Sequence, residues 1–344
     1  MRIGTNGCTY EWVEDWAQLP ASETARRGWA HPGAAVTAGG EVVTVHPGEP
    51  RLLVFGTDGA LRRSLPVDGL TEAHGLTVVR EARAEYLWVA DSGSKRAPGA
   101  GYEYPAVATG APGGGQAVKL RFDAARAAPL ARLGAPDLPE YRRPGARFSP
   151  TAVAVYEARH GGNGDVWVAD GYGQHLVHRF DRGGAYRGSL TGLEGPDGPF
   201  RTPHAVYVDT RKREPELYVA DRGNRRLVVY DLDGRFKRVA ARDVLTSPSA
   251  FATDGEHLFV AELRARLTVL DGADRLVTHL GENEAVCATP GWPNPPDGGG
   301  RPSRPGGLTP GRFHSPHGIA ADAAGNLYVA EWLIGGRYTM LARV

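Results

Sequence analysis

The sequence has few cysteines, almost no net charge and no long apolar run. Cys8 and Cys287 are too few for a disulfide framework, although they would allow one bridge. No apolar stretch is long enough to cross a membrane, and the opening residues MRIGTNGCTYEW lack the apolar core of a secretory signal. A formal net charge of +1 gives no electrostatic reason to expect nucleic-acid or membrane binding. We therefore expect a cytoplasmic, monomeric protein with neither of these partners.

Helical periodicity is also lacking, and short β-strand patterns recur instead. Versions of the motif LYVAD appear six times, ending at His46, Asp91, Asp170, Asp221, Glu262 and Glu331. The unit is about 40 residues long, with long insertions in the second and fifth intervals. Each copy follows a shorter apolar segment, and most copies precede a third segment that ends in a turn such as Asp-Gly.

This pattern predicts an all-β protein with one domain, a six-bladed β-propeller over residues 1–344. The expected blades span 31–66, 74–133, 148–190, 203–240, 247–281 and 315–344. The last blade has only three strands before the chain ends. The alternating segment 9–16 should supply its outer strand and close the ring, which removes exposed sheet edges.

Strand order predicts which groups share a face of the ring. Residues before the first strand of a blade and residues after its second strand lie at the same mouth of the central channel. The insertions 92–118 and 282–313 open on that side as well. Long Gly/Pro-rich segments in a compact fold often serve as binding loops, so we expect these two to lie over the mouth.

Three histidines point to a metal. His74, His204 and His317 each precede the first strand of the second, fourth and sixth blades, whereas Thr151 and Ser249 stand in intervening blades. In a closed ring the three imidazoles would converge on the axis. Three histidines with an open fourth position form a typical catalytic zinc site, so we expect zinc or another divalent transition metal.

Several segments resemble NHL-repeat propellers. They are FSPTAVAV (148–155), VWVADGYGQHLVHRFD (166–181), FRTPHAVYVD (200–209), LYVADRGNRRLVVYD (217–231) and FHSPHGIAADAAGNLYVAE (313–331). Within that group the chain is similar to the catalytic domain of peptidyl-α-hydroxyglycine α-amidating lyase and its bacterial relatives. The resemblance implies a zinc-dependent lyase that uses His74, His204 and His317 as ligands, Tyr172 as catalytic base and Arg222 in the active site.

The chain departs from that family at several positions. Its first-blade motif reads His46-Pro47-Gly48-Glu49, so the family's arginine is replaced by Pro47. The family's acidic calcium ligand is replaced by Gly318, which leaves a structural calcium ion without that ligand. The histidines and the tyrosine of the family motif are kept, whereas the groups that would surround the substrate differ. The resemblance therefore implies related chemistry on a different substrate.

The residue types at the mouth also suggest a mechanism by their own chemistry. A metal held by three histidines would polarise a substrate hydroxyl or carbonyl, Tyr172 would accept a proton, and Arg222 has the bidentate geometry that suits a carboxylate. His46 lies close enough to the mouth to contact substrate or act as a further donor. The expected substrate is a hydroxyl-bearing small or peptide-like molecule.

Two alternatives stay open at this point. The chain is also compatible with a non-catalytic NHL propeller that binds a peptide or protein at the channel mouth, or with a propeller hydrolase or isomerase of specialised metabolism. The acidic residues that end the LYVAD motifs are interpreted as structural caps of backbone N–H groups in the turn that follows each of them. His175 and His178 are interpreted as surface residues, and His31 receives no role because it lies outside the repeated frame.

Overall fold

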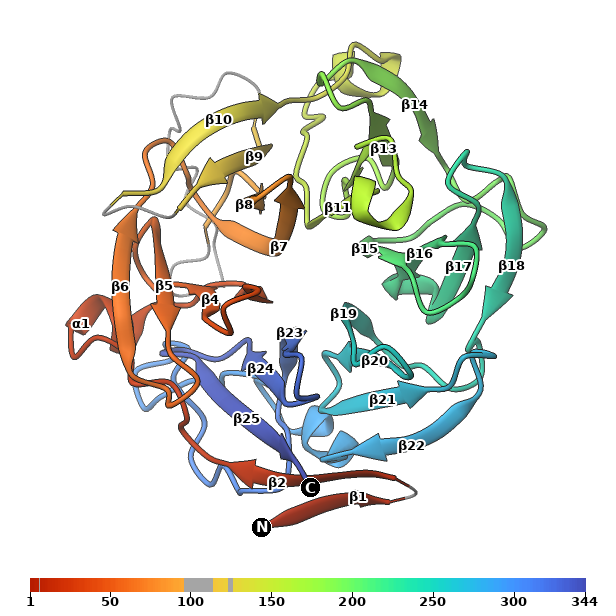
Figure 1. Cartoon of the computed structure of the whole chain (residues 1–344). Coiled ribbons are helices and arrows are strands. Elements are labelled where there is room, and N and C mark those ends of the chain that lie inside the picture. Colours follow the sequence, from red (N-terminus) through yellow and green to blue (C-terminus); the bar gives the residue numbers. More distant parts are fainter. Residues whose placement is uncertain (6, 96–113, 123–125) are drawn as a thin grey trace.

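The computed structural model describes residues 1–5, 7–95, 114–122 and 126–344, and it confirms the predicted six-bladed propeller. Six antiparallel sheets surround a central axis (Figure 1). Their innermost strands are neighbours around the ring, in the order β3, β7, β11, β15, β19 and β23.

Each of the first three blades has four antiparallel strands that follow one another in chain order across the sheet. Blade 1 holds β3 (Ala34–Val36), β4 (Val42–Val45), β5 (Arg51–Phe55) and β6 (Leu61–Pro66). Blade 2 holds β7 (Ala73–Glu81), β8 (Ala84–Asp91), β9 (Gln116–Arg121) and β10 (Ala128–Leu133). Blade 3 holds β11 (Ala152–Val155), β12 (Val166–Ala169), β13 (Val177–Phe180) and β14 (Tyr186–Leu190).

The remaining blades continue in the same way. Blade 4 holds β15 (Pro203–Asp209), β16 (Glu216–Asp221), β17 (Arg226–Tyr230) and β18 (Phe236–Ala240). Blade 5 holds β19 (Pro248–Thr253), β20 (Leu258–Glu262), β21 (Arg266–Leu270) and β22 (Leu276–Leu280). Blade 6 holds β23 (Pro316–Ala321), β24 (Leu327–Glu331) and β25 (Arg337–Arg343).

The N-terminus closes the ring, as the sequence predicts. Strand β2 (Cys8–Val13) pairs with β25 in antiparallel register, with Trp12 opposite Leu341. A further strand, β1 (Arg2–Thr5), pairs with β2, so this blade has five strands where four are expected. The two chain ends therefore lie on the same blade (Figure 1).

Helices are short and lie between strands. They comprise α1 (Glu23–Arg27) and the 3₁₀ helices η2 (Pro139–Arg142), η3 (Ala158–His160), η4 (Arg222–Asn224) and η5 (Glu284–Ala288). No helix in the described ranges is long and apolar enough to cross a membrane.

Apolar side chains fill the spaces between neighbouring blades. The second strands are buried on both faces, which explains their nearly continuous apolar sequences such as VWVA and LYVA. For example, Val43 and Val45 of blade 1 belong to the same buried cluster as Leu87 and Val89 of blade 2. Packing of this kind makes the ring a rigid support for groups at its axis.

The acidic residues at the ends of the second strands are structural, as predicted, but all five cap the loop that precedes the first strand of their blade, and two of them, Asp91 and Asp170, also cap the following turn, where capping was expected. Asp91, Asp170, Asp221, Glu262 and Glu331 are buried. Each carboxylate accepts hydrogen bonds from backbone N–H groups of the loop before the first strand of its blade, such as Glu72 N to Asp91 at 2.9 Å and Ser315 N to Glu331 at 2.7 Å. These bonds hold the loop before each of these first strands, including the three loops that lead into His74, His204 and His317.

Candidate functional site

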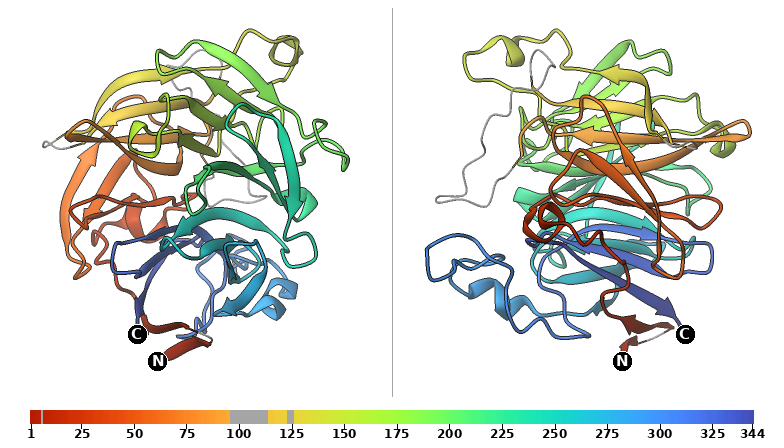
Figure 2. Two further views of the ribbon diagram at one scale, coloured as in Figure 1. Left: turned by 45° about the vertical axis from the view of Figure 1, so that its right-hand side comes forward. Right: turned by 90° about the vertical axis from the view of Figure 1, so that its left-hand side faces the viewer.

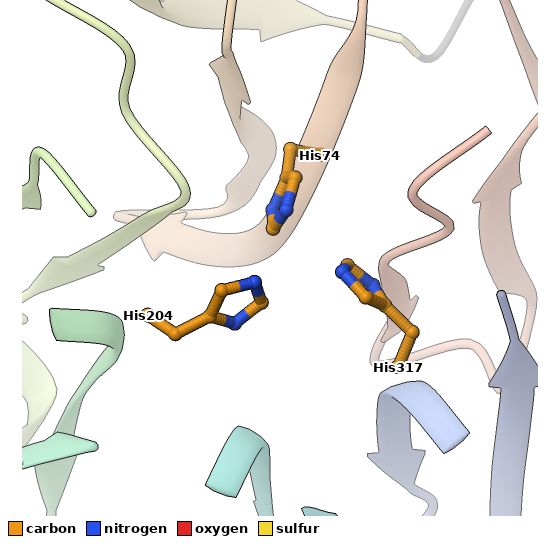
Figure 3. Close-up of side chains that lie close together, drawn as sticks. All are labelled: His74, His204 and His317. Atoms are coloured by element: carbon orange, nitrogen blue, oxygen red, sulfur yellow. The ribbon is translucent and has the colours of Figure 1, made fainter. Parts of the chain in front are cut away.

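The three predicted histidines meet at the axis of the propeller. His74 lies on β7, His204 on β15 and His317 on β23, and their rings point toward one another (Figure 3). One ring nitrogen from each lies within 4.8 Å of the others, and all three side chains are buried. The convergence expected from alternate blades is therefore present in the structure.

The intervening blades orient these rings. The Nδ1 of His74 lies 2.6 Å from the carbonyl oxygen of Thr151, and the Nδ1 of His204 lies 2.7 Å from that of Ser249. The Nδ1 of His317 lies 3.3 Å from the carbonyl oxygen of Pro32. Because a carbonyl only accepts hydrogen bonds, each Nδ1 carries the proton and each Nε2 keeps a lone pair, as in metal-binding histidines.

Close backbone contact between blades explains a glycine after two of these histidines. A Cβ atom at Gly75 would lie 2.5 Å from the oxygen of Thr151, and one at Gly318 would lie 2.3 Å from the oxygen of Pro32. A side chain at either position would push apart the inner strands that bring the rings together. The replacement of an acidic side chain by Gly318 therefore has a steric reason.

The electrostatics of the cluster favour neutral imidazoles. Burial lowers the pKa of His74, His204 and His317 well below the ordinary value of 6.5. Neighbouring groups lower these pKa values further: His317 acts on His74, Arg222 on His204, and His31 on His317. Neutral rings are the form that binds a metal ion.

The donor set fits a divalent transition metal. The Nε2 of His317 is buried and has no hydrogen-bond partner among the described residues, which is costly unless a ligand satisfies it. In a tetrahedral zinc site with bonds of about 2.0–2.1 Å, the ligand nitrogens lie about 3.4 Å apart. Small inward movements of the rings would bring the three nitrogens to that separation.

Tyr172 and Arg222 lie beside the histidines. Tyr172 follows β12, and its hydroxyl oxygen is 3.0 Å from the Nε2 of His204 and 3.4 Å from the Nε2 of His74. Arg222 begins η4, and its Cζ lies 5.4 Å from the centre of the Tyr172 ring. The Nη1 of Arg222 is buried without a hydrogen-bond partner among the described residues. A phenolic hydroxyl and a cationic group thus flank the candidate metal position.

A pocket of about 320 Å³ opens above the cluster at the predicted mouth. Its wall includes Tyr172, Arg222, Arg147 and His317, together with Ser92 and Ser149. No carboxylate is among the described residues that line it. A second cavity of about 290 Å³ lies along the inner strands and also reaches His74 and His317. The histidines therefore separate two parts of the central channel.

His46 does not join this group. Its Nδ1 accepts hydrogen bonds from the backbone N–H groups of Gly48 at 3.1 Å and Glu49 at 3.0 Å, and it is not part of the pocket wall. The ring stabilises its own turn at the end of β4. Its proposed contact with substrate stays a prediction.

His31, which received no role from the sequence, lies next to the candidate metal ligands. Its ring centre is 5.1 Å from that of His74 and 5.4 Å from that of His317. A signal was present, since AHPG at 30–33 matches AHG at 73–75 with a proline inserted. Gly33 packs against the oxygen of His74 as Gly75 packs against that of Thr151, so Pro32 occupies the frame of the histidines and displaces His31 by one residue.

The interpretation of His178 as a surface residue is wrong. The side chain is fully buried, and burial lowers its pKa to about 4. Its Nε2 lies 2.6 Å from the hydroxyl of Tyr141, which also donates a hydrogen bond to Asp170. The side chain of His178 is buried because η2 covers the face of β13 to which it points. The sequence around residues 139–142 gives no indication that this segment covers the blade.

The insertions are described only in part. Residues 96–113 of the first lie outside the described residues. Figure 2 shows the chain after β22 projecting from one face of the ring. Within it, the side-chain oxygen of Asn294 accepts a hydrogen bond from the backbone N–H of Ile334, and Trp292 donates one to the oxygen of His314. These bonds hold the second insertion beside the loops that flank His317, whereas a covering role for either insertion stays a prediction.

Comparisons with known proteins show structures with a similar fold but assign the chain to no family. No family model matches the chain, and no curated protein matches its sequence. Among solved structures, a streptogramin B lyase matches with a TM-score of 0.55 and 12% identity, covering 96% of this chain and 97% of that one. A virginiamycin B lyase from Staphylococcus aureus matches with a TM-score of 0.54 and 12% identity, covering 97% of this chain and 100% of that one.

A third match is a catalytically inactive histidine-to-alanine variant of the Staphylococcus aureus virginiamycin B lyase, with quinupristin. It has a TM-score of 0.53 and 11% identity, and it covers 97% of this chain and 100% of that one. At such low identity these matches show the propeller fold alone. The similarity to the amidating lyase finds no support among them.

Proposed function

We propose that this protein is a metal-dependent lyase that acts on a hydroxyl-bearing small or peptide-like substrate. The observation that carries the proposal is the convergence of three buried, neutral histidines at the floor of a pocket that also contains Tyr172 and Arg222. Their Nδ1 atoms are held by backbone oxygens, and the Nε2 of His317 lacks a partner among the described residues. A structural cluster would more often satisfy all of its ring nitrogens.

Zinc bound by His74, His204 and His317 would act as a Lewis acid on an oxygen of the substrate. As a phenolate, Tyr172 would take the proton of a substrate hydroxyl at its own oxygen, which lies 3.0 Å from the Nε2 of His204. As that O–H electron pair forms a carbonyl, a C–N or C–O bond on the same carbon breaks. The leaving atom keeps the bonding pair and receives a proton, so the reaction splits one molecule into two.

Arg222 would bind an anionic part of the substrate. Its guanidinium carbon lies 5.4 Å from the centre of the Tyr172 ring, and the wall contributes no described carboxylate that would oppose an anion. The planar fork of an arginine matches a carboxylate with two hydrogen bonds. The pocket of about 320 Å³ has room for a small molecule or the end of a peptide.

The fold comparison supports the reaction class without establishing it. The similar structures described above are lyases, and one of them is inactive when a histidine is replaced by alanine. These facts favour a lyase over the non-catalytic peptide-binding alternative. Because the chains share only 11–12% sequence identity, the substrates of those lyases do not identify the substrate of this protein.

Metal analysis tests the proposal directly. Purified protein should contain or take up about one equivalent of zinc, and His204→Ala should remove that binding, because two of three protein ligands do not hold the ion at neutral pH. His160→Ala is a suitable control, since His160 lies in η3 outside the pocket wall. A protein with no bound metal and no affinity for zinc or another divalent ion would contradict the proposal.

A further inference from the structure

The loop that carries Tyr172, called here the Tyr172 loop, is built around the carboxylate of Asp170. This side chain is fully buried at the end of β12. It accepts hydrogen bonds from the backbone N–H groups of Ser149 and Gln174, each at 2.6 Å. The carbonyl oxygen of Ser149 in turn accepts the backbone N–H of Tyr172 at 3.2 Å. A Cβ atom at Gly173 would lie 2.1 Å from a carboxylate oxygen of Asp170, so the loop follows the surface of that group closely.

Blade 3 differs from the blades after it in the partner of this acid. In blades 4 to 6 the third strand begins with an arginine that forms a buried ion pair with the acid at the end of the second strand. These pairs are Arg226 with Asp221 at 2.7 Å, Arg266 with Glu262 at 2.7 Å and Arg337 with Glu331 at 2.9 Å. In blade 3 the residue opposite Asp170 is Leu176, whose carbonyl oxygen accepts the backbone N–H of Asp170 at 2.8 Å. The repeat therefore supplies no arginine to Asp170 at this position.

Tyr141 takes the place of that arginine. It lies on η2, in the segment before the first strand of blade 3, and its hydroxyl donates a hydrogen bond to Asp170 at 2.6 Å. Burial and the neighbouring Asp170 carboxylate raise the pKa of Tyr141, so the hydroxyl keeps its proton. The carboxylate thus has three donors, two from the backbone and one from a neutral side chain.

His178 fixes the direction of the Tyr141 hydroxyl. The Nε2 of His178 lies 2.6 Å from the Tyr141 oxygen, and its Nδ1 lies 2.7 Å from the hydroxyl of Ser189. Because the single hydroxyl proton of Tyr141 points to Asp170, Nε2 is the donor to the Tyr141 oxygen and Nδ1 accepts from Ser189. A neutral ring fits the pKa of about 4 that burial gives His178. The buried chain from Ser189 to Asp170 is therefore satisfied at every step.

We propose that Tyr141 and His178 are positioning residues for Tyr172, whose hydroxyl they hold beside His204 by acting through Asp170. This inference rests on the proposed function, in which Tyr172 accepts a proton. Such a group has to be held to within about 0.5 Å of its working position. The carboxylate of Asp170 fixes the Tyr172 loop on both sides of Tyr172, through Ser149 and through Gln174, and Tyr141 in turn fixes the carboxylate.

Fluorine NMR on protein labelled with fluorotyrosine reports on Tyr172 directly. The chain has 13 tyrosines, and Tyr172→Phe identifies the signal of Tyr172 by its loss. The chemical shift and width of that signal depend on the groups around the ring and on its motion. The zinc-loaded wild type should show one narrow signal. In zinc-loaded Tyr141→Phe the signal should move and broaden, because Asp170 loses one of its three donors while the ring of residue 141 is kept.

Tyr230→Phe is the matched control. The hydroxyl of Tyr230 also donates to a carboxylate, that of Glu194 at 3.1 Å, but Tyr230 lies on β17 in blade 4. Both variants should lower the temperature of unfolding, because each loses a hydrogen bond to a carboxylate. Only Tyr141→Phe should change the Tyr172 signal, and this difference separates positioning from a contribution to stability alone.

His178 provides a rescue test. His178→Gln keeps a side-chain N–H that can donate to Tyr141, whereas His178→Leu removes it. The Tyr172 signal should stay near its wild-type position in His178→Gln and should move in His178→Leu in the same direction as in Tyr141→Phe. The positioning role would be overturned by an unchanged signal in Tyr141→Phe, by an equal change in Tyr230→Phe, or by equal changes in the two variants of His178.

Failure of the proposed function would be visible separately, because zinc content is measured before the spectra are recorded. A wild-type protein that takes up no metal would overturn the proposed function, and the positioning role would fall with it. Zinc content should be equal in the wild type and in the variants of Tyr141, His178 and Tyr230, since none of them removes a proposed ligand. A wild type that binds zinc, together with a Tyr172 signal that does not respond to Tyr141→Phe, would overturn the inference alone.

Discussion

The two sides of the histidine cluster are built differently. On the side of His74 and His204, the Nδ1 atoms lie 2.6 and 2.7 Å from the carbonyl oxygens of the next blade, and both Nε2 atoms approach the hydroxyl of Tyr172. On the side of His317 the corresponding Nδ1 distance is 3.3 Å, and Nε2 has no partner among the described residues.

The difference follows from what stands in the intervening blades. Thr151 and Ser249 have hydroxyls that bond to carbonyl oxygens of their own and the next blade, including Pro203 O and Pro316 O. Pro32, at the equivalent place in blade 1, has no hydroxyl. The side of His74 and His204, called here the regular side, is held by these hydroxyl bonds, whereas the His317 side lacks the corresponding bond.

The largest effect should come from removing one ligand from each side. His74→Ala and His317→Ala should both weaken zinc binding more than about 100-fold, because a site with two histidines lacks the third bond that a catalytic zinc site needs. Competition with a zinc chelator measures this. If His317→Ala kept wild-type affinity, the regular side alone would bind the metal and the comparison would fail.

Acidification should destabilise the metal-free protein by several kcal/mol. The three histidines have folded pKa values below their unfolded value of 6.5, so the unfolded state binds more protons as the pH falls below about 6.5. Each then reduces the free energy of unfolding by up to about 1.4 kcal/mol per pH unit, until its folded pKa is reached.

Urea denaturation of the metal-free protein at pH 7.5, 6.5 and 5.5 checks this expectation. The loss should be larger between pH 6.5 and 5.5 than between pH 7.5 and 6.5. His204→Gln should show a smaller loss over that interval than the wild type, because it has one buried histidine fewer. An equal loss in both proteins would show that other groups cause the acid sensitivity.

Gly75→Ala and Gly318→Ala should each destabilise the fold by about 1–3 kcal/mol, since an added Cβ would overlap a backbone oxygen of the next blade. Gly272→Ala is the matched control because nothing lies within 4 Å of a Cβ at that position. Thermal unfolding of all three variants compares the two sides. No effect of Gly318→Ala would mean that the backbone on the His317 side can shift to accommodate the added Cβ atom.

Tyr172→Phe should have the smallest effect on stability, within about 1 kcal/mol, because it removes two hydroxyl contacts and keeps the ring. Zinc affinity should stay within about threefold of the wild type, since the hydroxyl is not a ligand in the proposal. Chelator competition on this variant provides the check. A large loss of affinity would show that Tyr172 binds the metal.

Site residues that follow the repeat could be predicted from the sequence, whereas residues that depart from it could not. The frame shared by His74, His204 and His317 was visible because each lies directly before a first strand in alternate blades. Tyr172 and Arg222 were found because they follow second strands in recognisable motifs. His31 was missed because Pro32 shifts it by one residue, and His46 matches a strand end in sequence but turns its ring into its own loop.

The buried position of His178 could not be predicted either. Its burial depends on η2, a segment far from the repeat frame whose Tyr141 reaches over blade 3. Likewise the fifth strand of the last blade, Arg2–Thr5, is too short and irregular to show a strand pattern of its own. It forms because β2 presents an unpaired edge.

The sequence by itself determined the number of blades, the closure by the N-terminal strand and the convergence of three histidines, because regular strand patterns and fixed offsets within a repeat carry over to a ring. Only the tertiary structure decided which ring nitrogens face the axis, that His31 stands beside them and that His178 is buried. Those features depend on contacts between blades and on loop segments outside the repeat, where no local pattern specifies the neighbour.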